Sequence, residues 1–172
     1  MRQTITLAAA AVLLTSCQTV PRASEAGTVE THDAMVRRIN PAAMAIWEVS
    51  DNAKSEAGGL DPALMNARAW AKITRAAQSL ERASRDMAAA RTLKVGAHTA
   101  VEPGFADRDE IQARLDANPD WFRALSGKLA DDAHELQAAA VARDLQQTRD
   151  LAQNLNEACQ TCHTRYWEKP GA

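Results

Sequence analysis

Aromatic residues are scarce in this chain of 172 residues, at 4% of the sequence, and β-branched residues are also few. Glycine and proline number only seven and six. This shortage, together with abundant alanine, leucine, arginine, glutamate and glutamine, favours helix throughout. No convincing strand pattern and no internal repeat is found. We therefore expect an all-α protein.

An excess of positive charge is also lacking. From residue 18 onward, 19 basic residues stand against 22 acidic ones, and no basic stripe follows any segment. Binding to the phosphates of nucleic acid needs clustered lysine and arginine. Nucleic acid is therefore not expected as a partner.

Long apolar runs are missing as well, except for one at residues 5–14 after the positive Arg2. At about ten residues this run is too short to span a bilayer and fits the apolar core of an export signal. It continues into Leu14-Thr15-Ser16-Cys17, which resembles the lipobox of bacterial lipoproteins, where the cysteine is acylated after cleavage. We expect residues 1–17 to be a lipoprotein-type signal peptide; an ordinary signal peptide that ends near a cysteine is the alternative.

Acyl chains on Cys17 would hold the protein to a membrane surface. Residues 18–30 are polar, have almost no apolar bulk and are expected to form a flexible tether. We expect an exported protein that is lipid-anchored at the periplasmic face of a bacterial membrane, with a soluble periplasmic protein as the alternative.

Only three cysteines are present, and two of them form the run Cys159-Gln160-Thr161-Cys162-His163. This C-x-x-C-H spacing is that of a covalent haem c attachment site. Thiols three positions apart lie on one face of a helix, where they can add to two vinyl groups of a porphyrin. The imidazole that follows can bind the iron. Cys159 and Cys162 are therefore the predicted haem tethers, and His163 is the predicted proximal iron ligand.

A C-x-x-C pair has other uses. A thioredoxin-like redox pair needs a preceding strand, and a zinc site needs two further ligands at similar spacing. The chain offers neither, because His32, His98 and His134 are scattered singly and are expected at the surface. A non-haem helical lipoprotein that uses the thiols for metal or redox chemistry is the poorest alternative.

Amphipathic periodicity predicts four long helices at about 31–56, 62–93, 119–142 and 145–166, a loop at 94–106 and a short helix at 107–117. Pro41 is expected to kink the first helix or to mark a local break in it, and Asp61 before Pro62 is the predicted N-cap of the second. Short connections make the helices of each pair antiparallel. Residues 31–172 are therefore expected to form an antiparallel four-helix bundle, with haem attached near the C-terminal end of the last helix.

A haem motif in the last helix of an all-α chain resembles the class II c-type cytochromes, the cytochrome c′ family and its low-spin relatives. A narrower resemblance to bacterial cytochrome c′-like proteins is carried by Asp33-Ala34-Met35, Ile39-Asn40-Pro41-Ala42-Ala43, Ile46-Trp47 and Cys162-His163-Thr164-Arg165-Tyr166-Trp167. The family usually has a basic residue four positions after the haem histidine. This chain has Trp167 there and Arg165 two positions after, so gas binding that depends on that charge is not carried over.

The resemblance also identifies candidates for the sixth iron ligand. In low-spin relatives a methionine of the first helix binds the second face of the iron, whereas in cytochrome c′ an apolar side chain blocks it. Met35 and Met44 are nine residues apart, about half a helical turn in phase, so they point in opposite directions unless Pro41 resets the phase. Met35 shares the apolar seam of the helix and is preferred, with plain core filling as the alternative.

Arg37 and Arg38 lie close to Met35, and Arg38 is a candidate contact for a haem propionate; a solvated charge is the alternative. The resemblance implies one covalent haem c, and class II cytochromes are often homodimers. We expect a non-enzymatic monohaem cytochrome that transfers single electrons between redox partner proteins. The alternative is a five-coordinate haem protein that binds NO or CO as carrier or sensor.

Overall fold

The structure is a computed structural model that describes residues 27–97 and 105–169. Its elements are β1 (Thr28–Glu30), α1 (Thr31–Ala34), η1 (Met35–Ile39), α2 (Asn40–Asn52), α3 (Ala67–Ala88), β2 (Thr92–Lys94), α4 (Arg108–Ala117), α5 (Pro119–Ala142) and α6 (Leu145–Tyr166). The predicted signal peptide with Cys17, residues 18–26 of the predicted tether and His98 lie outside the described residues.

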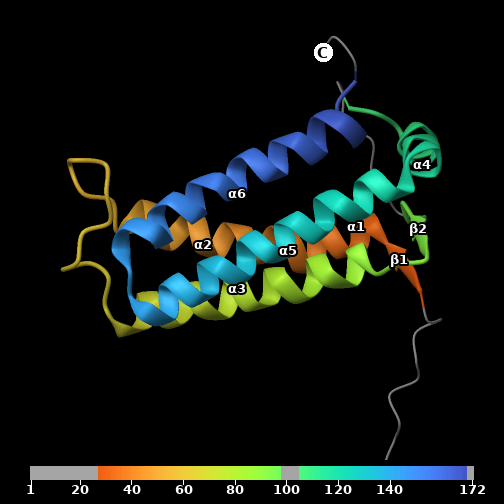
Figure 1. Cartoon of the computed structure of the whole chain (residues 1–172). Coiled ribbons are helices and arrows are strands. Elements are labelled where there is room, and N and C mark those ends of the chain that lie inside the picture. The colour runs from red at the N-terminus through yellow and green to blue at the C-terminus, as the bar shows by residue number, and fades with distance from the viewer. Residues whose placement is uncertain (1–26, 98–104, 170–172) are drawn as a thin grey trace, which may run out of the picture.

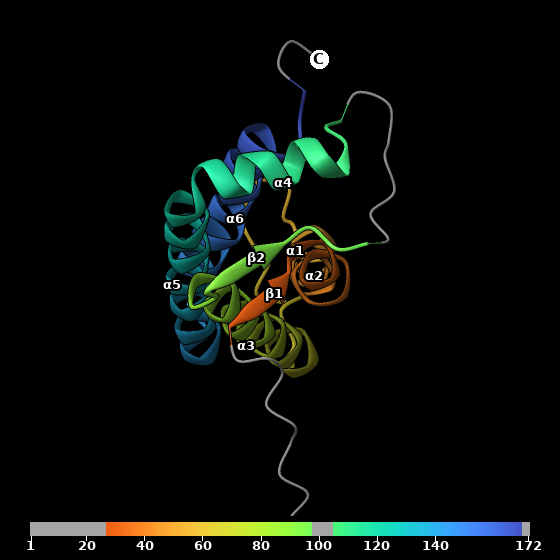
Figure 2. The same cartoon turned by 90° about the vertical axis from the view of Figure 1, so that its right-hand side faces the viewer.

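Most of the described chain is helical, which confirms the all-α prediction. Four long helices lie side by side; α2 and α5 run in one direction, and α3 and α6 run in the other (Figure 1). α3 and α5 make the most extensive contact, whereas α2 touches α6 only weakly. β1, β2 and α4 cover one end of the bundle (Figure 2).

The first predicted helix, 31–56, is divided into three consecutive segments. α1 passes into the π-helical η1 and then into α2, which has Pro41 in its first turn. Because Pro41 has no N–H group, it cannot donate the backbone hydrogen bond of a regular α-helix. The wider π-helical turn of η1 lies just before it. The expected kink is therefore a π-helical turn. α2 ends at Asn52, before the predicted Glu56, because Ala53 leaves the helical conformation.

The second predicted helix, 62–93, is too long at both ends. Asn66 caps α3 through its side-chain oxygen, which accepts hydrogen bonds from the N–H groups of Arg68 and Ala69 at 2.9 and 3.1 Å. The predicted cap, Asp61, instead accepts from the N–H of Ala63 within a turn. At the other end α3 stops at Ala88.

Two short strands occur where none was predicted. β1 pairs with β2 in parallel, with Val29 opposite Leu93. The side chain of Gln112 in α4 donates to the carbonyl of Leu93 and accepts from the N–H of Val95, so it pairs backbone groups beside β2. This pairing and the burial of Leu93 and Val95 stabilise an extended backbone, rather than a continued helix, after α3. The tether prediction is therefore wrong for Thr28–Glu30.

The later helices begin and end close to where they were predicted. Asp107 and Glu110 form a capping box at the start of α4. The side chain of Asn118 accepts from the N–H of Trp121 at the start of α5, and that of Asp144 accepts from the N–H of Gln147 at the start of α6. These polar caps satisfy free N–H groups of the first turns and so set where α4, α5 and α6 begin, the last of which contains the C-x-x-C-H motif.

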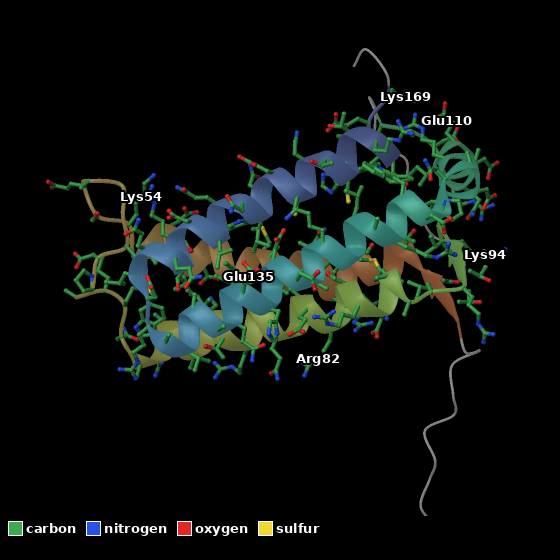
Figure 3. All side chains as sticks on the ribbon, viewed as in Figure 1. Lys54, Arg82, Lys94, Glu110, Glu135 and Lys169 are labelled. Atoms are coloured by element: carbon green, nitrogen blue, oxygen red, sulfur yellow. The ribbon has the colours of Figure 1, made fainter. Side chains whose placement is uncertain are left out.

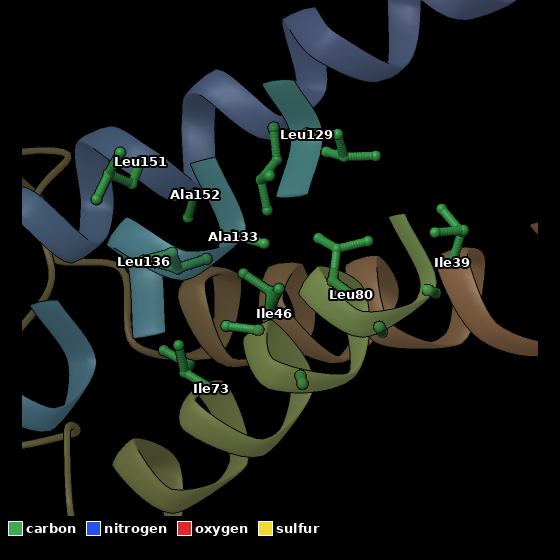
Figure 4. Packing of buried hydrophobic residues seen from close by; sticks show 14 of the residues in the cluster. Ile39, Ile46, Ile73, Leu80, Leu129, Ala133, Leu136, Leu151 and Ala152 are labelled. Carbon is green, nitrogen blue, oxygen red and sulfur yellow. The ribbon is translucent and has the colours of Figure 1, made fainter. Parts of the chain in front are cut away.

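Apolar side chains from all four long helices meet in one core, which Figure 4 shows around Ile46, Ile73, Leu80 and Leu136. One face of α3 is buried along its length, at Trp70, Ile73, Ala77, Leu80, Ser84 and Met87. Charged side chains such as Arg82 and Glu135 point outward (Figure 3). No described helix is long and apolar enough to cross a membrane.

Candidate cofactor site

The C-x-x-C-H motif lies in the last turns of α6. The side chains of Cys159, Cys162 and His163 are half-buried, whereas those of Gln160 and Thr161 between them are exposed. Neither cysteine takes part in a disulfide. The three chemically active groups therefore share the inward side of the helix, as their spacing requires.

A cavity of about 290 Å³ lies beside this motif, at the end of the bundle that α4 covers. Cys162 and His163 line it from α6, and Met35 and His32 line it from the N-terminal helical segments. Apolar side chains enclose it further, namely Val95, Ile111, Leu115, Phe122, Tyr166 and Trp167. The site is thus an apolar space with an imidazole at its wall.

A second cavity, of about 240 Å³, adjoins the first toward the middle of the bundle. Met35, Cys159, Cys162 and His163 all line it. Met35, Cys162 and His163 line both cavities, so the two spaces are neighbours with these side chains at their shared boundary. The structure therefore brings the two predicted tethers, the predicted proximal ligand and the preferred sixth ligand to one place.

Met44 lines the smaller cavity together with Met35, although the regular helical phase places them on opposite sides. The π-helical turn over Met35–Ile39, which precedes Pro41, changes the angular offset between Met35 and Met44 around the helix axis. This is the change of phase that the sequence allowed for at Pro41. Met35 is half-buried, whereas Met44 is 60% exposed. Met35 is therefore enclosed by the site, and Met44 lies at its margin.

The apolar surroundings act on the titratable groups of the motif. Burial raises the pKa of the Cys159 thiol, and burial together with the neighbouring Cys159 raises the pKa of Cys162 to about 11. Burial lowers the pKa of His163, although the carboxylate of Glu168 opposes this effect. Burial therefore favours the uncharged imidazole, which is the form that binds iron.

The indole ring of Trp167 contacts His163. The two ring centroids are 4.8 Å apart, and the rings are nearly perpendicular, at 82°. Phe105 in turn stacks on Trp167, with ring centroids 4.4 Å apart and ring planes inclined by 21°. In the sequence, Trp167 belongs to the run that resembles cytochrome c′-like proteins and replaces the family's usual basic residue, but its contact with Phe105 was not predicted because the two residues are distant in the chain.

The predicted propionate contact, Arg38, has a protein partner. Its guanidinium lies 2.6 Å from the carboxylate of Asp86 in α3, and the neighbouring Arg37 pairs with Asp33 at 2.6 Å. Neither arginine lines the two cavities beside His163. The structure does not bring Arg38 together with the other predicted site residues.

The tryptophans and histidines have different surroundings. Trp47 lines the smaller cavity and donates through Nε1 to the carbonyl of Ala152 at 3.3 Å, which ties α2 to α6. Trp70 is buried in α3. His134 is exposed, as predicted, but His32 is half-buried at the wall of the larger cavity, where the parallel pairing of β1 and β2 brings the start of α1. The surface prediction for His32 is therefore wrong.

The donor set and the space fit a covalent haem. Free thiols and an uncharged imidazole face an apolar cavity, and the two adjoining spaces together reach the roughly 300–1,000 Å³ typical of cofactor sites. Cys159 and Cys162 could hold the porphyrin, His163 could bind its iron, and Met35 faces the same space. Within the described ranges, no group of three or more His, Cys, Asp or Glu side chains is arranged to hold a metal ion directly.

Fold and motif together define a class II c-type cytochrome, an all-α protein with its haem motif in the last helix. A model of the family described as Cytochrome C′ matches residues 83–167, which include the end of α3, all of α5 and α6, and the whole motif. Over these residues the chain belongs to the cytochrome c′ family, which implies a covalently bound haem c. Comparison with curated proteins and with solved structures found no match.

Proposed function

We propose that this c-type haem protein is a monohaem cytochrome that carries single electrons. The observation that carries the proposal is the shared cavity of about 240 Å³, lined by Cys159, Cys162 and His163 from α6 and by Met35 from η1. A thioether opposite an imidazole is the ligand pair of closed, low-spin cytochromes, and it raises the reduction potential.

Each side chain has a part in this function. Cys159 and Cys162 would tether the porphyrin, His163 would bind its iron, and Met35 would be the second iron ligand that excludes external ligands. When bound, haem supplies the iron that alternates between its ferric and ferrous states. Buried Leu115 keeps water from the site and so lowers the local dielectric constant.

The site reaches the molecular surface beside the N-terminal helices. Val36 lines the larger cavity and is 51% exposed, and Met44 lines the smaller cavity and is 60% exposed. This apolar margin is where a redox partner protein can come close to the haem edge. The function therefore needs no channel and no bound substrate, and we expect a carrier rather than an enzyme.

Spectra of the purified protein test the proposal. A pyridine haemochrome should show one c-type haem per chain, and the variant with both Cys159→Ala and Cys162→Ala should hold none covalently. The ferrous protein should bind carbon monoxide weakly and slowly at neutral pH. Rapid, tight binding would favour the alternative of a five-coordinate carrier or sensor of NO or CO.

We further propose that acylated Cys17 anchors the protein at the periplasmic face of a bacterial membrane. The Leu14-Thr15-Ser16-Cys17 sequence and the haem motif support this location together, because c-type haem is attached outside the bacterial cytoplasm. Membrane fractionation should recover the parent protein with the membrane and the Cys17→Ser variant elsewhere. Recovery of both proteins in the soluble fraction would contradict the anchor. Sedimentation of the haem-loaded protein tests whether it forms the homodimer common among class II cytochromes.

A further inference from the structure

In the part of the chain that the structure describes, the His163 ring packs against the indole of Trp167 and has no protein hydrogen-bond partner. A metal-binding histidine generally donates its second ring N–H to a carboxylate, a carbonyl or water. The nearby carboxylate of Glu168 instead accepts from the hydroxyl of Thr164 at 3.2 Å.

Trp167 is itself held from several directions. Its backbone N–H donates to the carbonyl of His163 at 2.8 Å, and its carbonyl accepts from the N–H of Ala106 at 2.7 Å. Phe105 stacks on the indole with centroids 4.4 Å apart. The indole therefore cannot turn freely, and its position depends on the segment that precedes α4.

The residues after Trp167 are bound to the same part of the fold. Glu168 pairs with Phe105 in an isolated antiparallel bridge, and its carbonyl accepts from the guanidinium of Arg114 at 2.8 Å. The ammonium of Lys169 lies 3.8 Å from the carboxylate of Glu110, and both residues are labelled at this end of the molecule in Figure 3. α4 and the segment before it thus clamp the chain that follows α6.

We propose that Trp167 is the positioning residue for His163, in that its indole, fixed by Phe105, sets the orientation of the imidazole plane. Perpendicular aromatic rings are a favoured arrangement, so the contact resists rotation of the imidazole about its Cβ–Cγ bond. An aromatic ring here takes the part that a hydrogen-bond acceptor has beside most metal-binding histidines. The inference rests on the proposed haem ligation by His163.

Electron paramagnetic resonance of the ferric, haem-loaded full-length protein tests this inference, because the signal depends on the orientation of the axial imidazole. The parent protein should give one signal. Trp167→Ala should broaden that signal or split it into several, and Trp167→Phe, which keeps an aromatic ring, should restore it. Phe105→Ala should broaden the signal less, because Trp167 remains but loses its stacking partner. Trp70→Phe, a change at a buried tryptophan of α3, should lower the unfolding temperature and leave the signal single.

A single, unbroadened signal in the Trp167→Ala protein would overturn the inference. If Trp167→Ala yields no haem-loaded protein, Phe105→Ala is measured in its place, and a single, unbroadened signal in that variant would overturn the inference. Different results refute the proposed function and the positioning role of Trp167. Absence of c-type haem from the parent protein refutes the proposed function, whereas a parent-like signal in haem-loaded Trp167→Ala refutes only the positioning role.

Discussion

Replacement of Met35 by alanine separates an electron carrier from a gas-binding protein. Met35 lines both cavities that His163 lines, and it is the residue of η1 proposed to close the second face of the iron. The change removes the thioether and leaves the tethers and the proximal histidine in place. The haem-loaded variant should therefore lose its low-spin spectrum and become high-spin.

The expected size of each effect follows from the position of Met35. Because the side chain is only half-buried, its removal should cost about 1 kcal/mol of unfolding free energy, below the roughly 2–5 kcal/mol of a fully buried methionine. If the Met35 thioether is dissociated from the iron in about 1% of the molecules, the affinity for carbon monoxide is about 100-fold lower than that of an open iron. The Met35→Ala variant should therefore bind carbon monoxide about 100-fold more tightly than the parent protein. A large change in affinity with a small change in stability identifies a ligand rather than a packing residue.

The assay combines ferric absorption spectra, carbon monoxide titration of the ferrous protein and thermal unfolding. Met44→Ala is the matched control, since Met44 lines the smaller cavity but is mostly exposed. It should keep the parent spectrum and affinity. An unchanged spectrum and an unchanged affinity in Met35→Ala would refute the assignment, and a change in Met44→Ala alone would transfer the role to Met44.

Three further substitutions test the packing and the charges. Arg38→Ala should lower the unfolding free energy by at most about 1 kcal/mol, because its ion pair with Asp86 is exposed, and the reduction potential should stay unchanged; a shifted potential would restore the propionate contact. Leu155→Ala, at a fully buried position of α6, should cost about 2–5 kcal/mol in denaturant unfolding, and a loss well below 1 kcal/mol would contradict the packing described. Burial opposes the ionisation of Glu81, but hydrogen bonds and charges from Arg85 and His134 outweigh it and lower its pKa. The ionised carboxylate therefore stabilises the fold above the ordinary glutamate pKa, and this stabilisation is lost as the pH falls through the lowered pKa. Glu81→Gln should be less stable than the parent protein at pH 7 and equally stable in acid. An equal loss of stability at both pH values would contradict the lowered pKa.

Helices with strong local signals were predictable from the sequence. The start of α5 follows from Asn118 before Pro119, and that of α6 follows from Asp144, because caps act through neighbouring backbone groups. The predicted start of α3 was wrong because Asp61 also has cap chemistry and the sequence does not show that Asn66 satisfies the free N–H groups. The strands were missed because three residues are too few for an alternating pattern.

The chemistry of the candidate site was predictable for a similar reason. Cys159, Cys162 and His163 lie within five consecutive residues, so their spacing alone places them on one side of a helix. The contact between Phe105 and Trp167 depends on the pairing of Phe105 with Glu168, two residues far apart in the chain, so no local sequence pattern predicts it. The π-helical turn that brings Met35 and Met44 to one cavity is likewise a response to Pro41 that periodicity does not reveal.

The central claim is that Cys159 and Cys162 hold one haem by covalent bonds. The intact mass of the denatured, purified protein tests it most directly, because denaturation releases a cofactor that is bound only by coordination. The mass should exceed that of the polypeptide by one haem, and peptide mapping should place the added group on the peptide with Cys159 and Cys162. A polypeptide with no added haem and two free thiols at these positions would contradict the claim.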